Sequence, residues 1–212
     1  PGGTPEYDSQ VFRYTYTSMI TPPSVYDYDM AAHRGTLLKR QEVLGGYDPA
    51  QYVSERLWAT ARDGVRVPIS IVYKKGFQRD GKAPLFLYAY GSYGYGTPAS
   101  FSSNRLSLLD RGMAYAIAHI RGGDEMGEHW HDDGMLMKKK NTFFDFVDCA
   151  EFLVKEHWTT PQRMVIEGAG LASALSTYVG LLIMIGISLR PDYSRRDRFY
   201  RWAHTRGHID RD

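Results

Sequence analysis

The sequence predicts an α/β fold, in which a largely parallel sheet with crossover helices is preceded by a short segment of alternating strands. Two apolar runs without alternation, 85–90 and 114–120, suit strands that are covered on both faces, as in a parallel sheet. The stretch 142–155 then has apolar residues at helical spacing, and a third apolar run follows at 164–166. Strands that alternate with helices in this way are typical of an α/β architecture.

The composition is that of an ordinary folded protein. Of the 212 residues, 43% are hydrophobic and 24% are charged, which is typical of globular domains. A net charge of +2 indicates neither a nucleic-acid nor a membrane surface, and no apolar run reaches the roughly 18 residues of a membrane span. The single cysteine, Cys149, excludes an internal disulfide and favours a reducing, cytoplasmic compartment. The chain begins at Pro1 without a signal-peptide pattern, and we expect it to be part of a longer protein.

The first zone, residues 1–52, is rich in aromatic residues and alternates like a β-meander. Two strands are predicted, at 11–16 and 24–29, with a Thr21-Pro22-Pro23 turn between them. Such a meander is typical of one blade of a β-propeller. A single blade cannot bury its own faces, so we expect this zone to depend on neighbours.

The second zone, residues 53–190, carries the α/β pattern and opens with a hairpin. Its two apolar segments, 57–61 and 65–73, flank Asp63-Gly64, a strong short-range hairpin signal. The third zone, residues 191–212, holds many arginines and aspartates and little periodic hydrophobicity. It predicts a polar, basic tail with a composition found in disordered segments, which adds no buried strand.

A possible nucleophile elbow lies in the stretch RMVIEGAGLASAL, residues 163–175. A short apolar run, a turn of small residues and a second apolar stretch follow one another, as in the strained turn that projects a serine above a sheet. The turn, however, reads Gly168-Ala169-Gly170-Leu171-Ala172-Ser173. No serine stands between two glycines, so the expected nucleophile is missing from its place.

Long segments resemble the oligopeptidase B branch of the prolyl oligopeptidase family of serine peptidases. The most specific match is Arg121-Gly122-Gly123-x-Glu125-x-Gly127 followed by Trp130 and Asp133-Gly134, and the resemblance runs from about residue 10 to residue 168. The other segments that carry it are VFRYTYTSMITPPSVYDYDM (11–30), YVSERLWATARDGVRVPISIVYK (52–74), PLFLYAYGSYGY (84–95), the residues before that motif, LSLLDRGMAYAIAHI (106–120), and KKNTFFDF (139–146).

The resemblance implies a fold and an activity. Residues 1–52 would be the last part of a β-propeller, and residues 53–190 the first part of an incomplete α/β-hydrolase domain, which is the catalytic domain in this family. The implied enzyme is a serine endopeptidase that hydrolyses short peptides after Arg or Lys through an acyl-enzyme. It would use neither a metal nor another cofactor. Its oligomeric state stays open.

The resemblance also assigns site residues. It implies that the Tyr90 hydroxyl stabilises the oxyanion, against the alternative of a packed aromatic ring with a satisfied hydroxyl. Aligned without gaps, the nucleophile position falls on Gly170, which has no side chain that could attack a carbonyl. Ser173 is a weak alternative, because it lies about one turn inside the predicted helix. A gapped alignment places Thr177 at the nucleophile position instead.

The remaining members of a catalytic triad are also not found. α/β-Hydrolases take their Asp and His from loops after later strands, and Asp210 and His208 are too close in sequence to replace them. We therefore expect this chain to be catalytically incomplete. The alternative is a non-catalytic pseudoenzyme or interaction remnant of the same family.

Other clusters favour structural roles. The segment 129–133, HWHDD, contains metal-ligand residue types, but alternate residues of a loop rarely converge on one ion, so we expect no metal there. The Arg121 loop is interpreted as scaffold, with Arg121 and Glu125 as a structural ion pair. Cys149 is predicted to be a buried, inert thiol. The pair His204 and His208 lacks the glutamate of a zinc-protease motif and is interpreted as part of a solvated tail.

Overall fold

The computed structural model describes residues 6–168. Its contacts group residues 1–170 into one compact unit. The predicted strand segments, the hairpin and the helix at 142–155 all fall within the described residues. The domain boundaries at residues 52 and 190 stay predictions, and the predicted tail lies outside the described residues.

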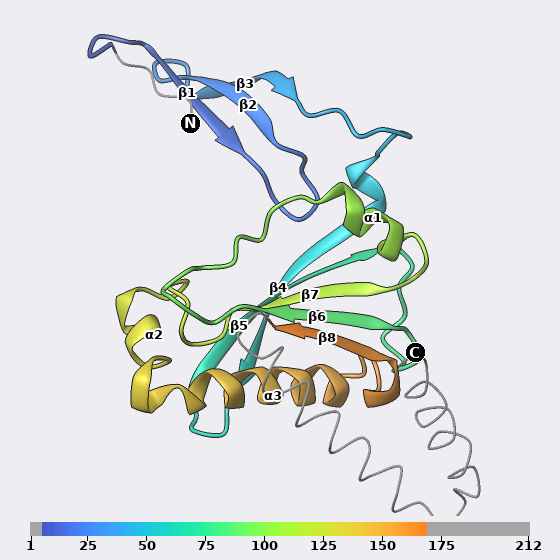
Figure 1. Ribbon diagram of the computed structural model, residues 1–212. Coiled ribbons are helices and arrows are strands. Elements are labelled where there is room, and N and C mark those ends of the chain that lie inside the picture. The colour runs from blue at the N-terminus through green and yellow to red at the C-terminus, as the bar shows by residue number, and fades with distance from the viewer. Residues whose placement is uncertain (1–5, 169–212) are drawn as a thin grey trace, which may run out of the picture. The chain divides into compact units, whose positions relative to one another are not determined.

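The first zone is a three-stranded antiparallel meander. It consists of β1 (Val11–Tyr16), β2 (Ser24–Asp29) and β3 (Arg34–Arg40), in the order β1-β2-β3 (Figure 1). The two predicted strands are confirmed. The third was not predicted, because its sequence RGTLLKR does not alternate and every residue of it is exposed.

This meander is held by its own cross-strand pairs. The rings of Tyr14 on β1 and Tyr26 on β2 stack across the strands with centroids 5.4 Å apart, and Phe12 stacks on Tyr14 within β1 at 6.1 Å. The hydrophobic side chains nevertheless stay open, since Phe12 is 51% and Leu38 49% exposed. The loop after β1 contributes Met19, which is buried against a cluster in the second sheet. The meander therefore has little core of its own.

We expect the amide protons of β1 and β3 to exchange much faster than those of β6 and β7, because exposed strands with few buried contacts open at low free-energy cost. Hydrogen exchange followed by mass spectrometry measures this difference. Equal protection in both groups of strands would mean that the meander is stabilised beyond its visible contacts.

The second zone forms a mixed five-stranded sheet. Its strands are β4 (Tyr52–Thr60), β5 (Arg66–Lys74), β6 (Leu85–Ala89), β7 (Ala114–Ala118) and β8 (Met164–Gly168), in the order β4-β5-β7-β6-β8. Strand β6 pairs in parallel with both β7 and β8, which confirms the three predicted core strands. The pairs β4–β5 and β5–β7 are antiparallel.

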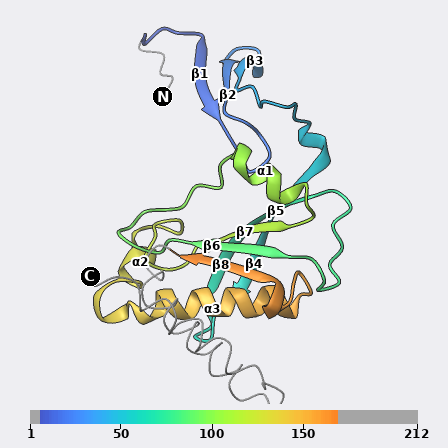
Figure 2. The same ribbon diagram turned by 45° about the vertical axis from the view of Figure 1, so that its right-hand side comes forward.

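The prediction of a largely parallel sheet is thus only half right. The turn at Asp63-Gly64 is too short for a crossover, so β4 and β5 must run antiparallel. Strand β5 keeps that opposite direction against β7. Parallel pairing begins where the connections contain helices. Figure 2 shows the three parallel strands side by side.

Helices cover both faces of this sheet. Helix α1 (Ser103–Leu109) lies on one face and α3 (Lys140–Lys155) on the other, while α2 (Glu128–Asp132) lies beyond the carboxyl end of β7 (Figures 1 and 2). Short 3₁₀ segments occur at Pro49–Gln51, Leu136–Lys138 and Pro161–Arg163. The helix predicted at 142–155 is confirmed and begins two residues earlier. Within residues 6–168, no helix has both the length and the apolar composition needed to cross a bilayer.

The connections reverse direction at the carboxyl ends of the parallel strands. From β6 the chain passes through α1 to β7, and from β7 it passes through α3 back across β6 to β8. The loops after β6 and β7 therefore leave toward opposite faces. In open α/β sheets, ligands bind outside the carboxyl ends of the strands at such a reversal. Any ligand site of this sheet is expected there.

Candidate active site

Tyr90 lies at the carboxyl ends of the parallel strands, directly after β6. Ala89 pairs with Gly168, so the ends of β6 and β8 are neighbours, and Tyr90 emerges next to the residue where β8 ends. The Tyr90 ring meets Tyr95 edge to face, with centroids 5.7 Å apart. Among the described residues, no group forms a hydrogen bond with the Tyr90 hydroxyl. The satisfied-hydroxyl alternative thus lacks its partner, and the oxyanion role stays a prediction.

The turn after Tyr90 is fixed by close packing. Gly91 has φ +62°, and a Cβ at this position would lie 2.6 Å from Ile120 Cγ1 and 2.7 Å from Thr142 Cγ2. Lys139 Nζ donates to the Gly91 carbonyl oxygen at 2.5 Å. Only glycine can occupy this position without displacing its neighbours. The backbone that carries Tyr90 therefore has little freedom.

The glycine-rich loop after β7 holds the turn from the other side. Gly94 N donates to Gly122 O at 3.0 Å, and Gly122 N donates to Trp130 O at 2.9 Å. His131 Nδ1 lies 3.2 Å from the same Gly122 oxygen. Gly122 has φ +103°, a conformation that favours glycine. The predicted scaffold role of this loop agrees with these bonds.

The predicted ion pair between Arg121 and Glu125 is wrong. Arg121 is 4% exposed and binds Asp145 of α3 through two bonds, Nη2–Oδ1 at 2.5 Å and Nε–Oδ2 at 2.8 Å. Its Nη1 lies 2.7 Å from Asp63 Oδ2 in the β4–β5 turn. Hydrogen bonding to Asp145 raises the pKa of the Arg121 guanidinium. The side chain points toward α3, whereas Glu125 turns toward the loop before α1.

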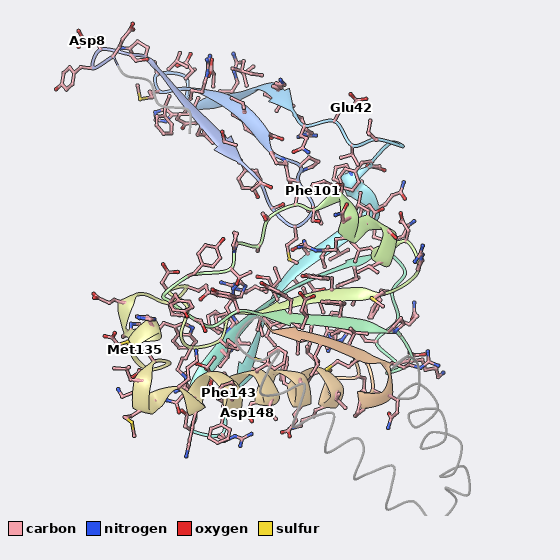
Figure 3. The ribbon with its side chains drawn as sticks, viewed as in Figure 1. Asp8, Glu42, Phe101, Met135, Phe143 and Asp148 are labelled. Atoms are coloured by element: carbon pink, nitrogen blue, oxygen red, sulfur yellow. The ribbon has the colours of Figure 1, made fainter. Side chains whose placement is uncertain are left out.

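A second link runs from the same hairpin to α3. Arg62 Nη2 lies 2.7 Å from Asp148 Oδ1, and the Arg62 backbone N–H donates to Oδ2 at 2.8 Å. Figure 3 labels Asp148 on α3. Burial by itself would raise the pKa of Asp148, but the side-chain and backbone hydrogen bonds and the charge of Arg62 together lower it. Two arginine–aspartate contacts thus tie helix and hairpin together.

Glu125 belongs to a buried hydrogen-bonded chain that the sequence did not reveal. His119 Nε2 lies 2.8 Å from Ser70 Oγ, and His119 Nδ1 lies 3.2 Å from Glu125 Oε1. Arg56 Nη1 donates to Ser70 Oγ at 2.8 Å, and the serine is only 6% exposed. Although the order is that of a Ser-His-Glu triad, the hydroxyl is not open to a substrate. These hydrogen bonds connect β5 to the loop after β7.

The segment 129–133 and Cys149 lie in or next to helices. Residues 128–132 form the short helix α2, in which Trp130 is buried. Within residues 6–168, no three His, Cys, Asp or Glu side chains are grouped as metal ligands. Cys149 is fully buried, as predicted, and burial raises the pKa of its thiol well above the usual value. Figure 3 labels Met135 in the loop that connects α2 to α3.

The elbow itself is described only up to its strand. Strand β8 ends at Gly168, which is buried, as expected for the strand that enters such a turn. The nucleophile position Gly170 and the alternative Ser173 lie outside the described residues. So do the gapped candidate Thr177 and the residues His204, His208 and Asp210.

Comparisons with known proteins identify similar sequences in one peptidase family. The profile described as "Prolyl oligopeptidase family" matches residues 99–172. A dipeptidyl aminopeptidase BI from Pseudoxanthomonas mexicana is 48% identical over 172 residues, which are 81% of this chain and 24% of the relative. A protease 2 from Moraxella lacunata is 36% identical over 87% of this chain and 27% of the relative.

Solved structures of oligopeptidases are similar to this fold. The structure of oligopeptidase B from Leishmania major matches with a TM-score of 0.70 and 44% sequence identity, over 77% of this chain and 23% of that one. The chain therefore spans about a quarter of the length of the proteins that it matches.

Proposed function

Because this chain belongs to the prolyl oligopeptidase family of serine peptidases, we propose that it derives from a peptidase of short peptides but does not itself hydrolyse them. The observation that carries the proposal concerns the neighbouring carboxyl ends of β6 and β8. Tyr90, directly after β6, has a hydroxyl without a partner among the described residues, and the sequence after β8 has Gly170 at the nucleophile position. An oxyanion donor stabilises a charge that arises only after a nucleophile has attacked. Without that nucleophile, the donor has nothing to stabilise.

In the intact peptidase, we infer that the substrate carries Arg or Lys before the scissile bond. The resemblance to oligopeptidase B supports this inference.

The second candidate is a non-catalytic interaction protein. The exposed apolar side chains of the meander favour it, because a large open apolar surface is typical of a binding face. Strand β8 adds to it as the edge of the described sheet, with Val165 48% and Ile166 37% exposed. Both candidates predict absent peptidase activity, and they differ in whether another protein is bound.

The purified 212-residue chain should not cleave arginyl or lysyl peptide substrates above background. Gly170→Ser should not restore turnover, because a serine needs a histidine that accepts its proton. Of the described histidines at this edge, His119 is bonded to Ser70 and Glu125, and His131 to a backbone carbonyl. A fluorogenic peptide assay measures the outcome.

Gly170→Ala serves as the matched control for the backbone change at the same position. Loss of a triad member costs on the order of 10⁴–10⁶ in kcat, so even a weak active site would stand out against this control. Turnover by the Gly170→Ser chain that a serine-directed inhibitor blocks would refute the claim that the site is incomplete.

A further inference from the structure

A serine and a lysine meet beside Tyr90. Lys139 Nζ lies 3.0 Å from Ser92 Oγ, and both residues are half-buried. The serine belongs to the loop after β6, whereas the lysine directly precedes the first residue of α3. The contact therefore joins the loop after β6 to the start of α3, and its serine is two residues from Tyr90.

Lys139 differs from its neighbour Lys138 in what surrounds it. Lys138 is exposed and lies 2.7 Å from Asp133 Oδ1, a bond that raises the pKa of the lysine. Lys139 instead has two neutral partners, the Gly91 carbonyl and the Ser92 hydroxyl. Burial lowers the pKa of Lys139. Within residues 6–168, no carboxylate forms an ion pair with Lys139, so nothing charged opposes loss of its proton.

The backbone around Ser92 is shaped like a tight, strained turn. Gly91, Tyr93 and Gly94 have φ values of +62°, +58° and +61°. A positive φ at a tyrosine is unusual, and such strain collects at functional sites. The backbone N–H groups of Ser92 and Tyr93 have no acceptor among the described residues, so they remain available as donors to a ligand.

We propose that Ser92 and Lys139 form a nucleophilic Ser–Lys pair that accepts an acyl group from an activated ester. Lysine serves as the general base for serine in known variants of the catalytic triad. This inference goes beyond the proposed function, because it concerns acylation of a different residue by a different class of compound. It does not depend on the nucleophile position at residue 170.

The proposed reaction is a transfer of the acyl group from the ester to Ser92. Ser92 Oγ attacks the ester carbonyl carbon and passes its proton to the neutral amine of Lys139. The free N–H groups of Ser92 and Tyr93 hold the negative oxygen. The bond to the leaving group then breaks, which releases an alkoxide or phenolate and leaves an ester on Ser92. The leaving group of an activated ester departs without being protonated, so the proton stays on Lys139, and the proposal is limited to such esters.

The probe for this step is p-nitrophenyl acetate. The 212-residue chain should release p-nitrophenolate and carry one acetyl group on Ser92, located by peptide mass spectrometry. Lys139→Arg keeps a cationic donor for the Gly91 carbonyl but cannot act as a base, and should slow acetylation of Ser92 by about 10²-fold. Lys138→Arg is the matched control next to it and should leave the rate unchanged. Ser92→Ala should abolish the modification.

The pH profile adds a second readout. Acetylation of Ser92 should rise with pH as Lys139 loses its proton, with a midpoint below the value of about 10.4 for a free lysine. Circular dichroism confirms that each variant is folded. The proposal fails if the acetyl group is found on Lys139 and not on Ser92, or if Lys139→Arg reacts like the unchanged chain. Peptide turnover is measured separately, so neither result decides the proposed function.

Discussion

Asp145→Ala should lower the free energy of unfolding by about 3–5 kcal/mol, as expected when one partner of a buried ion pair is removed. The Asp145 carboxylate is fully buried and accepts three hydrogen bonds from Arg121, including one from its backbone N–H. Without it, the guanidinium keeps, among the described residues, only the partly exposed Asp63 as an ion-pair partner. Urea denaturation followed by tryptophan fluorescence measures the loss.

Asp27→Ala is the matched control for this variant. It also removes an aspartate from an arginine pair, but Arg13 and Asp27 lie at the surface of the meander. Exposed pairs are screened by water and contribute little. We expect almost no change in stability for this control. A similar loss in both variants would show that burial does not set the strength of the Arg121 pair.

Gly122→Ala should also destabilise the fold strongly, by roughly 2–5 kcal/mol. A Cβ at Gly122 would lie 2.2 Å from the Gly91 carbonyl oxygen, and the backbone has φ +103°. The substitution thus combines a strained conformation with a contact that only movement of the turn can relieve. Because that turn carries Tyr90 and Ser92, the same variant should slow acetylation of Ser92.

Gly112→Ala separates the two causes. Gly112 has φ +81°, but nothing lies within 4 Å of a Cβ built there. The free energy of unfolding of this variant should fall only by the cost of the left-handed backbone conformation, about 1–2 kcal/mol. Thermal or urea unfolding of both variants gives the comparison. Equal losses would mean that the contact with Gly91 relaxes without cost.

Much of the fold follows from local sequence patterns. The runs that form β6 and β7 contain only aliphatic and aromatic residues and no charged ones, because both faces of these strands are covered. The hairpin follows from Asp63-Gly64, which fixes a tight turn. The exposed strand β3 has no such pattern and was missed. The direction of β5 against β7 also escaped prediction, because it depends on pairing between segments far apart in the chain.

Sequence patterns located a candidate site residue only where that residue marks the end of a strand. The position of Tyr90 directly after β6 follows from the apolar run that stops there, and its oxyanion role stays a prediction. The partner of Arg121 was not predicted correctly, since sequence spacing does not tell toward which face of the sheet a loop residue points. The contact between Lys139 and Ser92 joins residues 47 positions apart, and no periodicity reports such a meeting.

The links between the hairpin and α3 bear on the order in which the chain folds. The β4–β5 hairpin is local and can form early, whereas Arg62 and Asp148 are 86 residues apart. Closing so long a loop costs conformational entropy, and this cost arises before the contacts at its ends can stabilise it. Arg121 cannot leave water until Asp145 arrives with α3, because a buried guanidinium without its carboxylate is unfavourable. We therefore infer that the loop after β7 becomes buried only once α3 has docked.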